Sequence, residues 1–436
     1  MSHHPSQDQA GPPRIYTARA VLPPAGAALA GDARADVAVI GAGFTGLAAA
    51  LHLAQTGTGV AVLEARTIGW GASGRAFGQV VPYLQHDHSR ILAYYGPERG
   101  QRIIDAVAAG PSLVFDLINQ HSITADAVRT GLLFAAHTKA GRAGLEARTS
   151  YWQSRNAPVA MLDRPATAAA IGSGMYATAS LDQRGGHLNP YAYAIGLARA
   201  AARHGARFYP HTPVRGLRRD GNAWLITTPA GRMRADAVVI ATNAYGADLW
   251  PGLQRSFVAM RGHALVSTPL SNNLRRDILP GGQPLTDTRR LFSGVRLLPG
   301  GELHVSLDGP AFGAESTPFI ATAEARIAQL YPQLGKLNWQ EIWSGWIAIT
   351  PDHLPRVHEL APGVFAGLGY SGRGIAAATM MGREIALRLH GTAEADLAFP
   401  LSPLRRIPLH GLARLPAAAL LRWYRWRDAR DLSRSR

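Results

Sequence analysis

The stretch Asp36-Val37-Ala38-Val39-Ile40-Gly41-Ala42-Gly43-Phe44-Thr45-Gly46 decides the fold of this chain. Its first five residues form a short apolar run with β-branched side chains, as in a buried strand, and the run leads directly into G-x-G-x-x-G. A helical period then continues to Gly57, and Val60 to Glu64 predicts a second strand that ends on an acid. Because the glycine motif stands between a strand and a helix, the stretch predicts a βαβ unit that binds a dinucleotide.

Each glycine of this turn has a physical role in such a unit. Gly41 permits the tight turn, Gly43 lets the backbone approach a pyrophosphate, and Gly46 lets the helix pack closely on the strand. The first turn of the helix offers unpaired N–H groups and a partial positive charge to the phosphates. Glu64 is placed to accept hydrogen bonds from a ribose diol. The alternative interpretation is a structural glycine turn followed by a surface glutamate.

A second glycine-rich stretch, Gly69-Trp70-Gly71-Ala72-Ser73-Gly74-Arg75, follows five residues after Glu64. A simple NAD domain would continue with a helix and a strand at this point. A run of small residues that ends in Ser-Gly-Arg can instead offer backbone N–H groups, a hydroxyl group and a guanidinium group to a diphosphate. This spacing favours a flavoprotein.

Later segments extend the same domain. A helix is expected over residues 191–204, and residues 237–243 read as a buried parallel strand that ends in small polar residues. Residues 363–369 form another such strand, which leads through the turn 370–374 into a helix over 375–389. The N-terminus of that helix suits the pyrimidine side of a flavin, where reduction places negative charge. An ordinary strand-to-helix turn is the alternative.

Composition limits the classes of function. The chain has 436 residues, of which 47% are hydrophobic and 17% charged, so it is globular and long enough for two or three domains. It has no cysteine, which excludes disulfides, thiolate zinc sites, iron–sulfur clusters and a cysteine-linked cofactor. Residues 1–33 lack the pattern of a secretory signal, and no apolar stretch reaches the length of a spanning helix. We therefore expect a cytoplasmic protein.

The net charge of +16 could indicate nucleic acid, an anionic membrane or acidic substrates. Only Lys139 and Lys336 are lysines, whereas nucleic-acid binders usually mix lysine with arginine in clusters, so no nucleic-acid partner is expected. The tail from Leu401 to Arg436 carries nine arginines against two aspartates. Within it, residues 415–432 mix leucine and tryptophan with arginine. We expect this segment to pack on its own fold or on a partner subunit, in preference to lying on an anionic membrane.

Taken together, these motifs resemble the D-amino-acid oxidase superfamily of FAD-dependent oxidoreductases, and within it the enzymes of the gamma-glutamylputrescine oxidoreductase type. The resemblance also rests on Gly186-His187-Leu188-Asn189-Pro190, Leu285-Thr286-Asp287-Thr288-Arg289-Arg290 and Gly369-Tyr370-Ser371-Gly372-Arg373-Gly374. It extends over nearly the whole chain.

The resemblance implies an α/β fold, α+β overall, in which a discontinuous doubly wound FAD-binding domain is interleaved with a substrate domain. The FAD-binding domain would comprise residues 34–84, 186–246 and 340–392. The substrate domain, built on a mixed or antiparallel sheet, would comprise residues 85–185 and 247–339. An N-terminal extension (1–33) and a basic C-terminal tail (393–436) complete the chain.

The resemblance also implies the residues of the site. The cofactor-binding residues would be Gly41, Gly43, Phe44, Thr45, Gly46, Glu64, Arg66, Ser73, Gly74, Arg75, Gln79, Val214, Thr242, Gly372, Gly374 and Ile375. The candidates for substrate contact are Tyr245, His263, Arg289, Arg296, Trp346, Tyr370 and Arg373, and no single residue is assigned as catalytic. No metal site is expected, and His86-Asp87-His88 reads as a polar loop.

Three positions depart from the family's pattern. Ala76 and Phe77 stand where its closest members have Asn-Gly, which removes one polar contact near the flavin. Ala376 stands where sarcosine-type enzymes have a lysine that binds the substrate carboxylate, so a small N-methyl amino acid is disfavoured as substrate. Since the chain has neither the linking cysteine nor a histidine after Ser73, the FAD is expected to be noncovalent.

The function implied is oxidation of the C–N bond of an amine or amino acid, gamma-glutamylputrescine or a related compound, to an imine by hydride transfer to flavin N5. The expected partners are the small-molecule substrate and an electron acceptor, oxygen or another. Two alternatives remain open. One is a dehydrogenase that uses another acceptor, which the scarcity of lysine favours; the other is a nucleic-acid-associated, tRNA-modifying flavoprotein.

Overall fold

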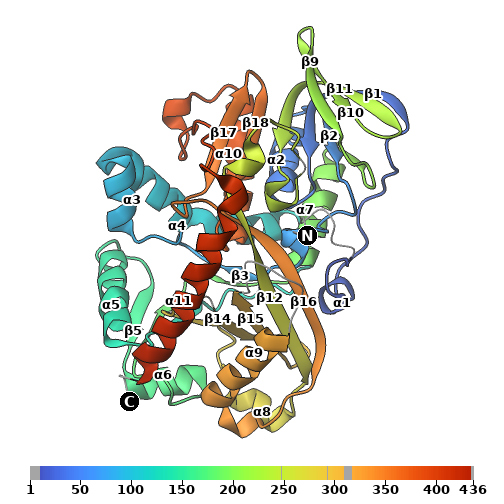
Figure 1. Cartoon of the computed structure of the whole chain (residues 1–436). Helices are drawn as coiled ribbons and strands as arrows, with labels where there is room; N and C mark the ends of the chain where they lie inside the picture. The colour runs from blue at the N-terminus through green and yellow to red at the C-terminus, as the bar shows by residue number, and fades with distance from the viewer. Residues whose placement is uncertain (1–9, 247, 292, 309–316, 434–436) are drawn as a thin grey trace.

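Two eight-stranded β-sheets organise the chain in the computed structural model, which describes residues 10–246, 248–291, 293–308 and 317–433 (Figure 1). The strand order of the first sheet is β17-β18-β11-β1-β2-β8, with the ribbon β9–β10 paired to β11. The strand order of the second is β16-β12-β15-β14-β13-β4-β6-β5. A short ladder of β3 (Gln79–Val80) and β7 (Gly186–His187) completes the strands of the described residues.

The first sheet has a parallel centre built from three distant parts of the chain. Its parallel strands are β1 (Gly31–Ile40), β2 (Val60–Leu63), β8 (Arg207–Tyr209), β11 (Gly231–Ile240) and β18 (Val364–Leu368). The antiparallel strands β17 (Arg356–Ala361), β9 (Gly216–Asp220) and β10 (Ala223–Thr227) lie at its edges. The predicted fold class is confirmed, and β1 begins earlier than the apolar run at Asp36 suggested.

Helices α2 (Phe44–Ala54), α7 (Pro190–Arg203) and α10 (Gly374–Leu389) cover one face of this sheet and share one hydrophobic core with it. Helix α4 (Pro97–Gln120) packs on α10, and α3 (His88–Tyr95) precedes it. The approach of α4 to α10 is close, because a Cβ atom on Gly110 would lie 3.2 Å from the Cβ atom of Ala376. Part of the predicted substrate segment 85–185 thus packs with the first sheet.

The second sheet is antiparallel apart from one parallel pair, β4 (Leu132–Ala135) with β13 (Leu285–Asp287). Its other strands are β5 (Val159–Leu162), β6 (Ala179–Asp182), β12 (Val258–Pro269), β14 (Ser293–Leu297), β15 (Glu302–Asp308) and β16 (Trp339–Ile349). Helices α5 (Lys139–Gln153), α6 (Arg164–Ile171), α8 (Asn272–Asp277) and α9 (Thr317–Leu330) surround it (Figure 1).

Strand β16 differs from the predicted division of the chain at one boundary. Residues 340–392 were assigned to the FAD-binding domain, but β16 pairs with β12 from Trp339 to Ile349 and so belongs to the second sheet. The physical reason is the long antiparallel ladder between these two strands, which has one register shift between Val266 and Ser267. The other domain limits stay a prediction.

Two terminal segments lie against this framework. The short helix α1 (Arg14–Thr17) buries Tyr16 against the second sheet, where its hydroxyl group contacts His304. The long helix α11 (Arg414–Ser433) crosses the front of the molecule in Figure 1 and ends near α5 and α6. No helix in the described part of the chain is long and apolar enough to span a bilayer.

Candidate functional site

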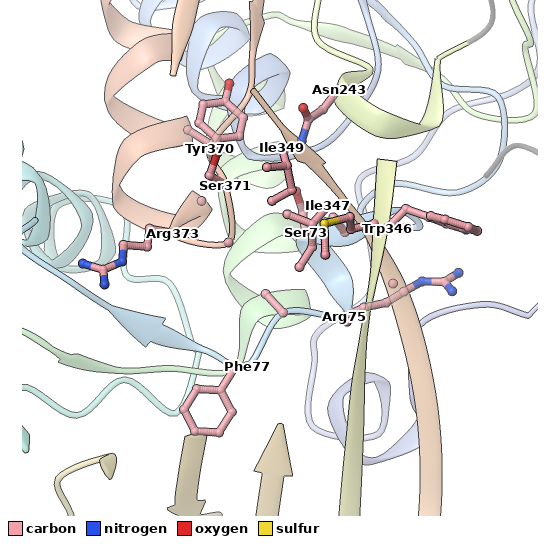
Figure 2. A pocket seen from close by; sticks show the side chains of 18 of the residues that line it. Ser73, Arg75, Phe77, Asn243, Trp346, Ile347, Ile349, Tyr370, Ser371 and Arg373 are labelled. Atoms are coloured by element: carbon pink, nitrogen blue, oxygen red, sulfur yellow. The ribbon is translucent and has the colours of Figure 1, made fainter. Parts of the chain in front are cut away.

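A cavity of about 1090 Å³ is lined by residues from both sheets, from the N-termini of α2 and α10, and from α11. Small-molecule sites usually occupy about 300–1000 Å³, so this cavity has room for a ligand larger than a typical drug-sized compound. All the predicted cofactor residues except Gly46 and Gly74 line it. Figure 2 shows this cavity with side chains from β16, the Ser73 turn and the α10 turn.

The turn at Gly41 brings β1 into α2 at one end of the cavity. Gly41 has a φ of 105°, which favours glycine, and a Cβ atom on it would lie 2.9 Å from the carbonyl oxygen of Ala241. Gly46 lies behind the cavity, where a Cβ atom would meet the carbonyl oxygen of Gly41 at 2.0 Å. This contact agrees with its expected role in packing the helix on the strand.

The start of α2 has no side-chain cap of its own. Its N-cap residue is Gly43, and the N–H group of Phe44 donates to the Ser73 hydroxyl oxygen at 3.0 Å. A Cβ atom on Gly43 would lie 2.9 Å from that hydroxyl oxygen. The two glycine-rich stretches therefore meet at the helix N-terminus, where a phosphate would find backbone donors and positive dipole.

Glu64 follows β2 and holds the neighbouring backbone with both carboxylate oxygens. Oε2 accepts the N–H group of Ala42 at 2.8 Å, and Oε1 accepts the N–H group of Arg66 at 2.9 Å. Burial raises the pKa of Glu64, and these backbone donors oppose that rise. The loop with Val214 also lines this end of the cavity, so the carboxylate lies where a ribose diol would meet it.

Arg75 is placed differently from its expected role at the diphosphate. Its guanidinium group donates to the carbonyl oxygens of Trp70 at 3.0 Å and Ser344 at 3.3 Å, and also to that of Ala10. It lies 4.5 Å from the centre of the Trp70 ring. Although Arg75 lines the cavity, much of its hydrogen-bonding capacity is used on carbonyl oxygens of the protein backbone.

Gly74 does not line the cavity. It is packed against the backbone, since a Cβ atom there would meet the carbonyl oxygen of Gly69 at 2.2 Å.

The turn before α10 forms the other end of the cavity. The Tyr370 hydroxyl group contacts the Thr45 hydroxyl group, and the Gln85 amide donates to the carbonyl oxygen of Ser371 at 2.7 Å. Burial raises the pKa of Tyr370, so its phenol stays neutral. Helix α10 also begins without a side-chain cap, which leaves its first N–H groups for a ligand.

Arg373, the N-cap residue of α10, points to the opposite side of the cavity from Arg75 (Figure 2). Its guanidinium group donates to the carbonyl oxygen of Leu84 at 2.6 Å and lies 5.2 Å from the centre of the Tyr83 ring. Burial lowers the pKa of Arg373 to about 10, so it remains a cation at neutral pH.

Six of the seven candidates for substrate contact line the cavity, and Arg296 does not. Arg296 is 2% exposed, and its guanidinium group contacts His187 at 3.1 Å, His304 at 3.3 Å and the Tyr16 hydroxyl group at 3.1 Å. It lies behind the cavity wall, because a Cβ atom on Gly78 would be 2.6 Å from it. Arg296 is therefore not placed to touch substrate; it connects α1, β7 and β15.

Four other candidates are held by protein partners. Arg289 donates to the Asp287 carboxylate at 2.6 Å, and Arg326 also binds that carboxylate. The His263 ring is 1% exposed and stacks on Phe319 at 4.2 Å. The Tyr245 hydroxyl group accepts the N–H group of Trp346 at 2.8 Å, which fixes both at the cavity wall. These contacts favour roles in shaping the cavity.

Sequence reasoning missed Arg148, which lines the cavity from α5. Its guanidinium group lies 4.4 Å from the centre of the Phe134 ring and 4.7 Å from that of Tyr83. The Tyr83 ring thus has two guanidinium groups near it, those of Arg148 and Arg373. Thr286, in the segment Leu285 to Arg290, also lines the cavity; its hydroxyl group is buried there and has no hydrogen-bond partner in the described structure. No sequence signal places α5 beside the α10 turn.

Helix α11 supplies Ala417, Leu420, Leu421 and Tyr424 to the cavity wall. It is tied to the second sheet by Arg290, whose guanidinium group binds Asp428 at 2.7 Å and Asp431 at 2.8 Å. The predicted packing of the tail on its own fold is therefore observed for α11.

Nitrogen and oxygen atoms of His137, Asp428 and Asp431 lie within 4.8 Å of one another, a grouping that could hold a metal ion, but Arg290 already supplies a cation to both carboxylates. In the other histidine cluster, His86 contacts the carbonyl oxygen of Asp352 at 2.6 Å, and the His88 ring stacks on Tyr151.

The residues present fit FAD. Two helix N-termini whose N-cap residues make no capping side-chain hydrogen bond, a glycine at the closest backbone approach and the carboxylate of Glu64 all border one cavity. These are the features that a diphosphate, a ribose and an anionic ring system require.

Comparisons with known proteins identify the family. The family model described as FAD dependent oxidoreductase (DAO) matches residues 36–388. Gamma-glutamylputrescine oxidoreductase of Escherichia coli (strain K12) is 32% identical over 403 residues, which cover 90% of this chain and 92% of that protein. Glycine oxidase of Geobacillus kaustophilus (strain HTA426) is 28% identical over 383 residues, 85% of this chain and 96% of that protein.

Solved structures agree with this result. The crystal structure of glycine oxidase from Geobacillus kaustophilus matches with a TM-score of 0.71 at 25% identity, covering 86% of this chain and 99% of that one. The crystal structure of L-proline dehydrogenase from P. horikoshii matches with a TM-score of 0.71 over 84% of this chain and 96% of that one, at 19% identity. The resemblance seen in the motifs is confirmed: the chain belongs to the FAD dependent oxidoreductase (DAO) family, and FAD is its cofactor.

Proposed function

We propose that this enzyme oxidises the C–N bond of an amine or amino acid that also carries a carboxylate at a distance from the reacting nitrogen. The observation that carries the proposal is the composition of the cavity, in which an FAD cradle at one side continues into a compartment bordered by Arg148, Tyr83 and Arg373. FAD supplies the two-electron oxidation when bound, and the protein supplies binding and orientation.

The two guanidinium groups are suited to an anionic part of the substrate. Arg148 rests on the rings of Tyr83 and Phe134, an arrangement that orients the guanidinium group and leaves its N–H donors for a ligand. Arg373 is fixed by the carbonyl oxygen of Leu84. Asp87 also lines this cavity, and its single negative charge balances only part of this positive charge. A carboxylate here would hold the substrate so that its other end faces the α10 turn.

Among the described residues of the cavity wall, neither Tyr370 nor His263 is arranged as a general base. Tyr370 is neutral because burial raises its pKa, and His263 is stacked on Phe319. We infer that the substrate nitrogen arrives as the neutral amine, whose lone pair assists loss of the α-hydrogen. The aromatic side chains of Tyr245, Trp346 and Tyr370 favour the uncharged form of the amine by limiting its contact with water.

The names of the relatives support this substrate class. A gamma-glutamylated putrescine, as in the name of the Escherichia coli relative, has a terminal amine and a distant carboxylate. We infer that this chain accepts a compound with the same two groups.

Anaerobic bleaching of the flavin tests the function. The purified yellow protein is mixed without oxygen with gamma-glutamylputrescine, putrescine, glycine and sarcosine, and the absorbance near 450 nm is followed. We expect bleaching with gamma-glutamylputrescine at lower concentration than with putrescine, which lacks the carboxylate. A flavin that no amine or amino acid bleaches would contradict the proposal.

A second candidate is a dehydrogenase that passes electrons to an acceptor other than oxygen. It is favoured by one observation: Lys139 and Lys336, the only lysines of the chain, are exposed, and neither lines the cavity. A compact ammonium group beside the flavin assists the reaction with oxygen, and the delocalised charge of arginine is a poorer substitute.

A further inference from the structure

Helix α11 has an inner face that packs on the protein and an outer face that is exposed to solvent. Ala417, Leu421, Tyr424, Asp428 and Asp431 recur at intervals of three and four residues and form the inner face. Three of these residues line the cavity, and the two aspartates bind Arg290. Leu421 is 7% exposed and Asp428 6%. The side chains of this inner face thus contact the rest of the protein.

The outer face presents large apolar side chains to solvent. Leu415 is 61% exposed, Trp423 46% and Trp426 53%. The segment that leads into the helix adds Leu409 at 78% and Leu412 at 57%. Monomeric proteins seldom leave several large apolar residues together on one exposed segment unless the surface binds a partner.

The charges of α11 are divided between its two faces. Both acidic residues of the helix lie on the inner face and are bound by Arg290. Arg422 and Arg425 are exposed, and Arg427 lies beside the Trp423 ring at 5.3 Å from its centre. The outer face therefore combines tryptophan and leucine with arginine and contains no carboxylate of its own helix.

We propose that the outer face of α11 binds the surface of an anionic lipid bilayer. Tryptophan rings prefer the depth of the lipid headgroups, where one edge is apolar and the other is hydrated. Arginines beside them meet the negative surface potential of anionic lipids. An acidic protein would match the arginines, but it would not account for two tryptophans and three leucines that are exposed along the same segment.

This placement would hold the enzyme with the mouth of its cavity near the bilayer. Leu420, 45% exposed, and Leu421 lie at the cavity wall, and the outer residues Trp423 and Trp426 follow within two turns. The helix stays bound to the protein through Arg290 and the inner face, so lipid binding needs no unfolding of the tail. The binding is peripheral, because no described helix can span a bilayer.

Flotation of the full-length holoenzyme with vesicles tests this proposal. We expect the protein to float with vesicles of phosphatidylcholine that contain phosphatidylglycerol, and to stay behind with phosphatidylcholine alone. Binding should weaken as salt is raised, since salt screens the attraction between arginine and anionic headgroups.

Two double variants separate the contributions. Trp423→Ala/Trp426→Ala removes the aromatic anchors. Arg422→Gln/Arg425→Gln removes two charges, for which we expect about a 30-fold loss of partitioning. The matched control, Arg218→Gln/Arg276→Gln, removes the same charge from exposed positions on β9 and α8 and should leave partitioning within about two-fold. Flavin content and far-UV circular dichroism are measured for all three to verify folding.

Three results would overturn the proposal. One is that the folded wild-type protein does not float with anionic vesicles. Another is that the control variant loses binding as strongly as Arg422→Gln/Arg425→Gln, which would indicate a general effect of net charge. The last is a concentration-dependent dimer in analytical ultracentrifugation that Trp423→Ala/Trp426→Ala abolishes, because a second copy of the chain would then cover this face.

Discussion

The hydroxyl groups of Tyr370 and Thr45 are in direct contact, and they join the turn before α10 to the first turn of α2. The two helix N-termini that border the cavity are thus fixed to each other as well as to the sheet. Both side chains are buried, with Thr45 4% exposed and Tyr370 7%.

Replacing Tyr370 with phenylalanine should leave the Thr45 hydroxyl group without this partner. We expect a loss of about 1–2 kcal/mol in the free energy of unfolding, together with weaker FAD retention. Thermal unfolding and FAD titration of the apo-protein measure the two effects. Tyr95→Phe is the control, because it removes the contact of a half-buried hydroxyl group with Arg356 away from the cavity. Equal FAD affinity in both variants would contradict the role given to Tyr370.

Gly43→Val should impair FAD binding, whereas Gly46→Val should impair folding. A side chain at position 43 would meet the Ser73 hydroxyl group, which can move, and would fill the space of the diphosphate. We expect that variant to fold and to lose its absorbance near 450 nm. A side chain at position 46 would meet the backbone of Gly41, so we expect loss of folded protein. Far-UV circular dichroism distinguishes the two, and a Gly43→Val protein that keeps stoichiometric FAD would refute the placement.

The affinity for FAD should fall in mild acid because of Glu64. A ribose diol donates to the ionised carboxylate, and burial raises the pKa of this group above its ordinary value, so the loss begins at a higher pH than for an exposed glutamate. In the apo-protein, the folded state binds the Glu64 proton more tightly than the unfolded state does. The contribution of Glu64 to the free energy of unfolding therefore decreases as the pH rises from the ordinary pKa of glutamate through the raised pKa of the folded state. FAD titrations from pH 5 to 8 test this; Glu64→Gln should bind FAD weakly and with little dependence on pH.

Arg148→Ala should raise KM for a carboxylate-bearing amine by about 30-fold, the effect of losing one charge-assisted hydrogen bond of about 2 kcal/mol. KM for an amine without a carboxylate should stay within about three-fold. The control is Arg142→Ala on the same helix, an exposed residue paired with Glu146. Steady-state kinetics with both substrates tests this prediction. An equal increase in KM for both substrates would mean that Arg148 only shapes the cavity wall.

Oxygen should restore the flavin absorbance slowly after anaerobic reduction by substrate, because the described cavity wall contains no lysine. An artificial acceptor dye should support faster turnover than air. Stopped-flow mixing with air-saturated buffer measures the return of absorbance near 450 nm. A return as fast as turnover, with peroxide formed in step with product, would identify an oxidase.

The residues expected to hold the cofactor could be predicted because they lie close together in the sequence. Gly41, Gly43 and Glu64 lie within one βαβ unit, where spacing determines which backbone groups can face a diphosphate. The α10 turn was predictable for the same reason, since a buried strand ending at Leu368 leads directly into the helix at Gly374. What FAD does at these residues remains a prediction.

The substrate half depends on how distant elements pack, which spacing does not determine. Arg148 lies on α5, and its approach to Arg373 depends on the second sheet as a whole. Arg296 was placed in the site from its segment, but the burial of Tyr16 beside it uses that guanidinium group inside the protein. The register of β16 on β12 was likewise not visible in the apolar pattern of either strand.

The central position of β1 has a consequence for the biosynthesis of the protein. Gly31 pairs with Gly231, which is synthesised 200 residues later. The neighbouring strand β11 can pair with β18 only after the chain has been synthesised past Val364. At about 5–20 residues per second, a ribosome leaves β1 without that neighbour for roughly 10–40 s. The nascent chain therefore exposes a hydrophobic strand edge during most of its synthesis, and a complete cradle for FAD exists only after translation has passed α10. FAD can therefore bind its complete site only late in translation or after it. Chaperones that shield nascent chains have the longest time to act at the first strand.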